Sequence, residues 1–416
     1  MTASPAVATP HGGGRTSLVS VSRDGSEPNR ESYGGMISTD GRYIAFTSSA
    51  SNLVRGDTNG VSDVFVRDLR KHTTQRVSVG TGGRQADQTA SAPSISADGR
   101  YVAFSSWATG LVPGDTNERG DIFVRDRRAG TTVRVSLTAT GGQAANASDN
   151  PAISADGRYI AFSSNAENLV AGDDNGEVDV FVHDRRRHLT QRVSVSSTGT
   201  APAGASTYPV ISANGRYVAF MSQAPNVVAD GSTAGGVFLR DLRRSTTVRV
   251  SRTDAGAPVT DAGPPAMSGD GRYVTFSSFT DDVAPGDHNG LQDVVVRDLR
   301  TSRTKLISVS SAGVQGDEPS AGAAISPDGR YVTFLSWATN LVPGDRNGYG
   351  DIFLHDRRTG TTERVSVLTS GAEANSASDG ATVSAGGRTV AMTSYASNLA
   401  PGDTDHAADV FVWSRR

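Results

Sequence analysis

Residues 325–334 read Ile-Ser-Pro-Asp-Gly-Arg-Tyr-Val-Thr-Phe, and variants of this decapeptide recur along the whole chain. The recurring core is an apolar residue, Ser, two turn residues, Gly and Arg. Successive copies start 58 residues apart, or 56 between the fourth and fifth, at Ile37, Ile95, Ile153, Ile211, Met267, Ile325 and Val383. Seven copies at a nearly fixed period predict one repeat array rather than the roughly two or three ordinary domains that 416 residues suggest.

Each repeat is predicted to contain four short strands. In the second repeat, strand A ends near Ile95, strand B covers 101–105, strand C covers 121–125 and strand D covers 131–136. The turn after strand A is Asp-Gly, Asn-Gly or Gly-Gly, and all three pairs tolerate the positive φ of a two-residue hairpin. The pattern therefore predicts an all-β fold, a seven-bladed β-propeller of four-stranded antiparallel blades.

The two chain ends predict how the ring closes. The last repeat stops after strand C and lacks strand D, whereas residues 16–21 align with strand D of the first repeat, residues 74–79. The N-terminal strand, 15–22, is therefore predicted to complete the blade of residues 383–414, which removes both exposed sheet edges. We expect a single propeller over 15–416 and a flexible tail over 1–14.

Composition excludes several classes of function. A net charge of −3 provides no field for nucleic acid or an anionic membrane, so no nucleic-acid partner is expected. The chain has no Cys, which excludes disulfides and thiolate metal sites. No stretch approaches the roughly 20 apolar residues of a membrane span. Residues 1–14 lack the basic and apolar regions of a signal peptide, so the sequence itself indicates no compartment.

The decapeptide at 325–334, with close variants at 95–104 and 153–162, resembles the WD40-like (PD40) repeat of TolB-type propellers. The resemblance covers residues 15–416 and implies the propeller fold. TolB-like proteins include periplasmic interaction scaffolds, and related propellers accompany hydrolase domains in some peptidases. The resemblance therefore favours an extracytoplasmic binding protein, although residues 15–416 leave no room for the extra N-terminal domain of TolB or for a hydrolase domain.

One face of the disc, with the A–B and C–D turns, is predicted to carry structural ion pairs. Arg follows the turn Gly in every repeat, and Asp stands at the end of strand C in six. Because the start of strand B lies beside the end of strand C, Arg42 is expected to pair with Asp68, and its equivalents likewise. A ring of free, anion-binding arginines is the alternative. Ser414 replaces the Asp of the last repeat, so Arg388 is expected to be less well paired.

The opposite face carries the long B–C loops and the candidate metal ligands. Six of the seven loops contain Asp-x-Asn/Asp-x-x-x-Asp after a Gly. The residues are Asp57, Asn59, Asp63, Asp115, Asn117, Asp121, Asp173, Asn175, Asp179, Asp287, Asn289, Asp293, Asp345, Asn347, Asp351, Asp403, Asp405 and Asp409. Oxygen side chains at positions 1, 3 and 7 of a tight loop resemble part of a calcium loop, and Ca²⁺ prefers about six to eight oxygens. We therefore predict up to six Ca²⁺ sites.

The same loop sequence has a second interpretation. Gly-Asp-x-Asn-Gly is also an ordinary Asx-turn, in which the last Asp accepts hydrogen bonds from the loop backbone. The sequence leaves both interpretations open. The loop of the fourth repeat, residues 230–236, has lost two residues and the closing acid, so no metal is predicted there.

An aromatic residue stands at the end of strand B in four repeats: Trp107, Phe279, Trp337 and Tyr395. These residues are candidates for stacking on a sugar or a peptide on the loop face. The alternative is that they wedge between neighbouring blades.

No nucleophile elbow, phosphate loop or dinucleotide fingerprint is present in the sequence. The acids recur with the repeat, whereas a catalytic site usually breaks the symmetry. The sequence thus favours a monomeric, non-catalytic scaffold whose loop face takes a protein or carbohydrate ligand. The alternative is an enzyme at the mouth of the central channel, a lyase or lactonase-like hydrolase that uses acids and arginines of the D–A loops.

Overall fold

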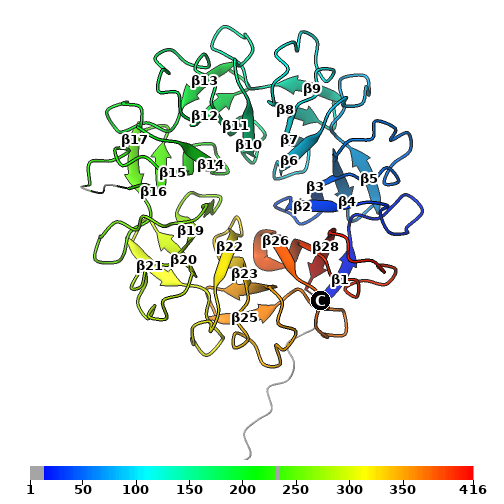
Figure 1. Ribbon diagram of the computed structural model, residues 1–416, viewed down its shortest axis with the longest axis vertical. Helices are drawn as coiled ribbons and strands as arrows, with labels where there is room; N and C mark the ends of the chain where they lie inside the picture. Colours follow the sequence, from blue (N-terminus) through cyan, green and yellow to red (C-terminus); the bar gives the residue numbers. More distant parts are fainter. Residues whose placement is uncertain (1–13, 231, 233, 416) are drawn as a thin grey trace, which may run out of the picture.

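A computed structural model describes residues 14–230, 232 and 234–415, which form seven four-stranded antiparallel sheets around a central axis (Figure 1). The predicted seven-bladed β-propeller is therefore confirmed. Residues 1–13 of the predicted tail lie outside the described residues. Within the described ranges, no helix is long and apolar enough to cross a membrane; a 3₁₀ turn, η1 (Ala385–Gly387), joins two strands of the last blade.

Each blade places its four strands in the predicted order outward from the axis (Figure 1). The innermost strands are β2 (Ser32–Ile37), β6 (Ala90–Ile95), β10 (Ser148–Ile153), β14 (Ser206–Ile211), β18 (Ala266–Met267), β22 (Ser320–Ile325) and β26 (Ser378–Val383). The second strands are β3 (Tyr43–Ser48), β7 (Tyr101–Ser106), β11 (Tyr159–Ser164), β15 (Tyr217–Ser222), β19 (Tyr273–Ser278), β23 (Tyr331–Ser336) and β27 (Thr389–Ser394). The third strands are β4 (Asp63–Asp68), β8 (Asp121–Asp126), β12 (Asp179–Asp184), β16 (Gly236–Asp241), β20 (Asp293–Asp298), β24 (Asp351–Asp356) and β28 (Asp409–Ser414). The outer strands are β5 (Thr73–Arg76), β9 (Thr131–Arg134), β13 (Leu189–Arg192), β17 (Thr246–Arg249), β21 (Arg303–Leu306), β25 (Thr361–Arg364) and β1 (Arg15–Leu18).

Blades 1 to 6 run from β2–β5 to β22–β25, and blade 7 consists of β26, β27, β28 and β1. Strand β1 pairs antiparallel with β28, with Arg15 opposite Ser414 and Leu18 opposite Phe411. The predicted closure by the N-terminal strand is therefore confirmed. The strand itself ends at Leu18, earlier than the predicted 22, although the N–H of Val19 still donates to the carbonyl of Val410 at 2.8 Å.

The repeated decapeptide is the A–B turn, and its polar residues hold that turn together. In blade 2, the Ser96 hydroxyl donates to Asp98 Oδ1 at 2.8 Å and accepts from the Tyr101 N–H at 2.9 Å. Asp98 Oδ1 also accepts from the Arg100 N–H at 3.0 Å. Because Asn offers the same side-chain oxygen as Asp, the exchange of Asp for Asn in the fourth repeat preserves the turn.

The turn Gly also serves the contact between blades. Gly99 has a φ of +70°, and a Cβ there would lie 2.2 Å from the ring of Tyr43 in the preceding blade. That ring lies between two guanidinium groups, with Arg42 of its own blade at 4.7 Å and Arg127 of the next at 4.8 Å from the ring centre. Only Gly satisfies both the backbone and the packing requirement. Blade 7 has Thr389 at the Tyr position, so its contact with blade 1 lacks this stack.

The predicted ion pairs of the turn face are confirmed. Arg Nη2 and Asp Oδ2 are 2.6–2.7 Å apart in Arg42–Asp68, Arg100–Asp126, Arg158–Asp184, Arg216–Asp241, Arg272–Asp298 and Arg330–Asp356. The Arg42 hydrogen bonds lower the pKa of Asp68 to about 2. These arginines are therefore structural braces rather than free anion ligands. No ion pair of Arg388 is found among the described residues, as the Ser414 replacement predicts.

Neighbouring A–B turns are linked by backbone hydrogen bonds around the turn face. The residue after the turn Ser donates to its equivalent in the next blade, in Ala97→Ala155, Ala155→Ala213, Ala213→Gly269, Gly269→Pro327 and Ala385→Thr39. Pro327 has no N–H and breaks this chain of bonds. There the N–H of Gly386 donates instead to the carboxylate of Asp328 at 3.1 Å.

The apolar core lies between blades rather than in one central mass. Between blades 1 and 2, Val64 and Val66 on β4 pack with Val102 and Phe104 on β7, all fully buried. A stacked Phe pair on the second and third strands recurs in five blades, with ring centres 5.6–5.9 Å apart. Burial against both neighbours makes each sheet rigid, so the loops start from fixed positions.

Candidate functional site

The B–C loop of blade 1 is closed by an arginine from the outer strand. Arg76 Nη1, at the end of β5, lies 2.8 Å from Asp57 Oδ1 and 3.1 Å from Asp63 Oδ2, the first and last acids of the loop. Asn59 Nδ2 also donates to Asp63 Oδ2, at 2.8 Å, and the Ser78 hydroxyl donates to Asp63 Oδ1 at 2.5 Å. The guanidinium thus occupies the space between the two carboxylates.

Three further blades repeat this arrangement. The distances from the Arg Nη1 to the first and last acids are 2.9 and 3.3 Å for Arg134, 2.9 and 3.2 Å for Arg192, and 2.9 and 3.1 Å for Arg364. In blade 4, which has no closing acid, Arg249 and Arg252 both pair with Asp230, at 2.6 and 2.8 Å. The structure therefore brings the predicted site residues together with an internal cation in these blades.

The sequence interpretation missed these arginines. Each lies thirteen residues after the closing acid, on another strand, and the antiparallel pairing of strands C and D returns it to the loop, with Arg76 opposite Phe65. The signal was the recurring tripeptide Arg-Val-Ser, which begins at 76, 134, 192, 249 and 364. The predicted calcium sites in the four arginine-closed acid loops remain predictions, and there a metal would compete with a guanidinium already in contact with both acids.

Blade 5 has Leu306 in place of the arginine. Gln315 Nε2 connects the two acids instead: it donates to Asp287 Oδ1 at 3.1 Å and to Asp293 Oδ2 at 3.2 Å. An amide supplies hydrogen bonds without a charge. Burial, together with the nearby Asp293 carboxylate, raises the pKa of Asp287 to about 6.

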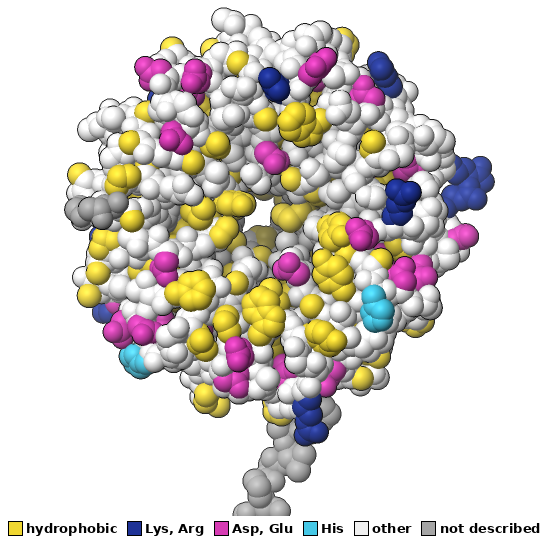
Figure 2. Space-filling model, viewed as in Figure 1, with side chains coloured by type: hydrophobic (Ala, Val, Ile, Leu, Met, Phe, Trp, Pro, Cys, Tyr) yellow, Lys and Arg dark blue, Asp and Glu magenta, His cyan; other side chains and the backbone are white. Residues whose placement is uncertain are grey.

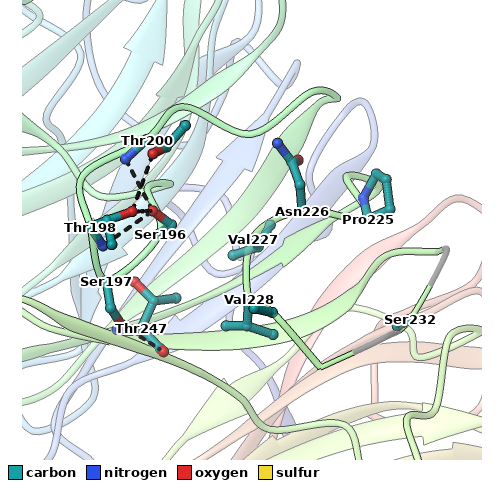
Figure 3. Close-up of a pocket in the computed structure, with 11 residues that line it drawn as sticks. Ser196, Ser197, Thr198, Thr200, Pro225, Asn226, Val227, Val228, Ser232 and Thr247 are labelled. Carbon is teal, nitrogen blue, oxygen red and sulfur yellow. Dashed lines mark hydrogen bonds between the residues drawn. The ribbon is translucent and has the colours of Figure 1, made fainter.

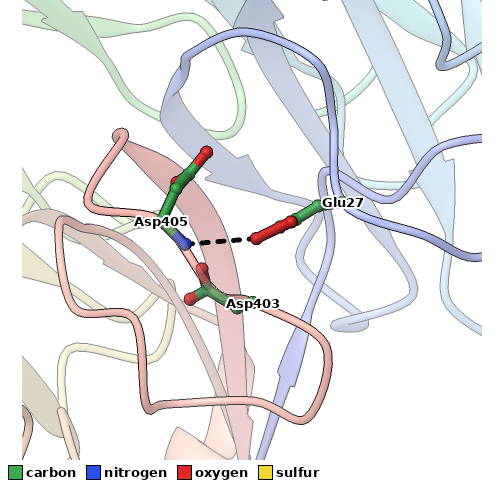
Figure 4. Close-up of side chains that lie close together, drawn as sticks. All are labelled: Glu27, Asp403 and Asp405. Carbon is green, nitrogen blue, oxygen red and sulfur yellow. Dashed lines mark hydrogen bonds between the residues drawn. The ribbon is translucent and has the colours of Figure 1, made fainter.

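Blade 7 has neither bridge. Leu18 stands opposite Phe411 at the position of the arginine, and Glu27 replaces the amide. Carboxylate oxygens of Glu27, Asp403 and Asp405 lie within 4.8 Å of one another, and the three side chains converge from two loops (Figure 4). We call these three residues the acid cluster.

Asp403 is the buried member of the acid cluster. It is 5% exposed, and its Oδ2 has no hydrogen-bond partner among the described residues. Burial, followed by the charges of Glu27 and Asp405, raises its pKa to about 7. Behind it, burial raises the pKa of Asp409 to about 8, even though the Ser20 hydroxyl donates to it at 2.7 Å.

The four predicted aromatic residues lie at the ends of the second strands and are open to solvent. Trp107 is 49% exposed, Phe279 57%, Trp337 45% and Tyr395 40%, so they do not wedge between blades. The two indoles lie over loop glycines. A Cβ at Gly120 would be 3.3 Å from Trp107, and a Cβ at Gly350 would be 3.1 Å from Trp337.

Three exposed tyrosines add to this surface and were not predicted. Tyr33 and Tyr208 lie on the innermost strands and Tyr349 on the B–C loop of blade 6. The Tyr33 hydroxyl donates to Glu31 at 2.7 Å, and Tyr208 has a φ of +51° at a β-bulge of β14. On the face shown in Figure 2, hydrophobic groups are spread around the central opening, with polar atoms between them.

The two buried histidines do not form a channel-mouth site. His183 on β12 and His355 on β24 lie in third strands, and each ring Nδ1 contacts a Thr hydroxyl of the outer strand at 3.0 and 2.9 Å. Burial lowers the pKa of both rings to about 4. A neutral ring fixed to an outer strand is a structural element, not an acid–base group beside the channel.

A groove of about 610 Å³ lies at the rim of blade 4 (Figure 3). Hydroxyls of Ser196, Thr198 and Thr200 line one wall and bond to one another, at 2.8 Å and 3.2 Å. A groove of similar size lies at the equivalent place in blade 7. Because its polar groups satisfy one another and the groove recurs, it belongs to the repeat rather than to a unique site.

No family model matches the chain, and no curated protein does. Among solved structures, the chain is similar to the β-propeller domain of the Trilobed protease from Pyrococcus furiosus, at 12% identity and a TM-score of 0.55, covering 92% of this chain and 93% of that one. It is also similar to oligogalacturonate lyase from Vibrio parahaemolyticus, at 11% identity and a TM-score of 0.54, covering 97% of both chains. TolB from Acinetobacter baumannii matches at 16% identity and a TM-score of 0.43, covering 78% of this chain.

The chain spans 63% of the length of that TolB. The propeller fold that the resemblance implies is thus confirmed, since the seven sheets of the chain match the Pyrococcus β-propeller domain at a TM-score of 0.55. These proteins include an enzyme and a protease domain, so the shared fold does not determine function. The Pyrococcus domain is described as having an open velcro topology, whereas β1 closes this ring.

Proposed function

We propose that this protein is a non-catalytic binding propeller that takes a carbohydrate polymer on its loop face. The exposed aromatic residues at one repeat position, Trp107, Phe279, Trp337 and Tyr395, carry the proposal. Large aromatic side chains left in water on a rigid scaffold are typical of recognition surfaces. The flat apolar face of a sugar ring stacks on such a side chain, while its hydroxyls bond to neighbouring polar groups.

The spacing of polar and aromatic residues favours a carbohydrate over a protein ligand. At the same strand position, the other three blades carry Ser49, Asn165 and Gln223. Phe279, Trp337 and Tyr395 occupy three successive blades, and polar residues stand on both sides of Trp107. The ring of positions therefore offers aromatic faces beside hydroxyl and amide groups, which suits a ligand with both apolar faces and hydroxyls. A protein partner would favour a contiguous apolar centre inside a polar rim.

The test is a binding panel of neutral and acidic polysaccharides with the double variant W107A/W337A. Removing an aromatic anchor typically weakens binding by about 2 kcal/mol, so roughly a 30-fold loss for each Trp is expected. The control is V133A/V248A, which trims two exposed apolar residues on the outer strands. If the wild-type chain binds a protein rather than a polysaccharide, and W107A/W337A does not bind that protein, the ligand is a protein. Binding unchanged in W107A/W337A would contradict the proposed surface.

A further inference from the structure

Three repeat positions change together in blade 7, and each change adds negative charge or removes positive charge. Relative to blade 1, Leu18 stands for Arg76, Asp405 for Asn59 and Glu27 for Gln85. The two acids common to all six loops, here Asp403 and Asp409, are kept. A loop that needs only a turn gains nothing from these three exchanges, since like charges at short range repel. Leu306 replaces the Arg in blade 5, and Glu373 replaces the amide in blade 6, where it pairs with Arg364 at 2.9 Å, so the distinctive feature of blade 7 is the combination of the three exchanges.

The side chains already form part of a coordination shell. Glu27 is fixed by the Thr404 hydroxyl, which donates to its Oε1 and Oε2 at 3.0 and 3.2 Å, and by the Asp405 N–H at 3.2 Å. The Thr404 N–H also donates to Glu27 Oε1, as the Thr58 N–H donates to Gln85 Oε1 at 3.1 Å in blade 1. Asp403, more than nine-tenths buried, adds an oxygen without a hydrogen-bond partner among the described residues. Figure 4 shows the three side chains close together, with the Asp405 N–H bonded to Glu27.

We infer that the acid cluster of Glu27, Asp403 and Asp405 binds one Ca²⁺ ion, which replaces the guanidinium that closes this loop in blades 1, 2, 3 and 6. Carboxylate oxygens are ligands of hard cations, and Ca²⁺ tolerates the irregular geometry of loops better than Mg²⁺ does. Glu27 and Asp405 reach the surface, so water completes the shell. The inference does not depend on ligand binding at the aromatic surface.

The position of the cluster gives the ion a structural role. Glu27 follows β1, whereas Asp403 and Asp405 precede β28, so contacts between the two loops join residues 377 apart in the chain. Blade 7 also lacks two turn-face contacts of the other blades, the Arg–Asp pair within the blade and the Tyr stack against the next blade. Calcium would therefore hold the closing strand β1 through the loop face of blade 7, the blade that has the fewest of these contacts on its turn face.

The experiment uses the full chain stripped with chelator and titrated with CaCl₂, followed by calorimetry and by thermal unfolding. One ion per chain is expected, with a Kd on the order of 10⁻⁴ M. Saturation is expected to raise Tm by roughly 2–4 °C and to slow amide exchange on β1. MgCl₂ at the same concentration is expected to have a smaller effect.

Two variants place the ion. L18R supplies the guanidinium of the other blades, and D403N removes the buried ligand; both are expected to abolish the calcium response while raising Tm in chelator. The control D345N alters the equivalent acid of the arginine-closed blade 6 and is expected to leave the response intact. A wild-type chain without heat or Tm change at 10 mM Ca²⁺, or a response retained by both L18R and D403N, would overturn the inference. Six ions per chain would also overturn it, in favour of sites in every acid loop.

Discussion

Blades 1 and 7 share one backbone plan and differ in how they compensate the buried acids of the B–C loop. In blade 1, Arg76 touches both Asp57 and Asp63. In blade 7, the corresponding acids have no cation within the described residues, and two more carboxylates face them. A buried carboxylate is unfavourable without a partner, so each loop needs a group that compensates its acids, a guanidinium in blade 1 and an uncharged amide in blade 5. The comparison teaches that one repeat position can be a structural brace in most copies and a ligand site in a single copy.

Removing Arg76, which closes the blade 1 loop, is expected to have the greatest effect on stability. R76L is expected to destabilise the protein by about 3–5 kcal/mol, because it leaves two buried carboxylates without their partner. Urea unfolding followed by tryptophan fluorescence measures the loss. R303L, at an Arg that is largely exposed on β21, is the control and is expected to cost about 0.5 kcal/mol or less. A loss below about 1 kcal/mol in R76L would show that the guanidinium is not what compensates these acids.

A second variant gives the B–C loop of blade 1 the three exchanges found in blade 7. The triple variant N59D/R76L/Q85E should be as unstable as R76L in chelator, and Ca²⁺ should restore about 2 kcal/mol when it is present at tens of times its Kd. The measurement is unfolding free energy as a function of Ca²⁺ concentration. R76L alone serves as the matched control, because it lacks the two added carboxylates. Equal recovery in both proteins would mean that Asp405 and Glu27 contribute nothing specific in blade 7.

The smallest effect concerns the turn face of the same two blades. S414D restores to Arg388 the partner that Arg42 has in Asp68, and a gain of up to about 1 kcal/mol is expected near pH 7. Since pairing lowers the folded-state pKa of Asp68 to about 2, the gain from the new Asp should be present above its unfolded pKa near 4 and lost as pH falls toward 2. Unfolding at pH 7 and pH 2.5 measures it, with S414N as the uncharged control. A gain that persists at pH 2.5 would argue against an ion pair.

Much of the fold follows from residues that the turn itself requires. The Ser, Asp and Gly of the decapeptide are hydrogen-bonded or sterically fixed, so their recurrence gave the blade count, the closure by residues 15–18 and the Arg42–Asp68 class of pair. Loop chemistry was less visible. A calcium loop and an arginine-closed loop place the same acids at the same spacing, and only the neighbouring strand D distinguishes them.

Asp403 and Asp405 of the acid cluster were predicted as metal ligands, whereas Glu27 was missed because it lies near the other end of the chain. The first and last loops contribute the three residues of the acid cluster. The alignment of residues 16–21 with 74–79 has to be extended to place Glu27 at the position of Gln85. The replacement of Arg-Val-Ser by Leu-Val-Ser at 18–20 was the remaining signal. Exposure of the aromatic residues was not predictable, because it depends on how far each loop rises beside the side chain.

The offset between repeat and blade has a consequence for inheritance. Because β1 completes the sheet of β28, the sequence repeat is offset by one strand from the blade. Gain or loss of one internal 58-residue unit by unequal crossing-over would leave the pairing of β1 with β28 in place. Ring size can therefore change during evolution without the joint between the termini having to be invented again.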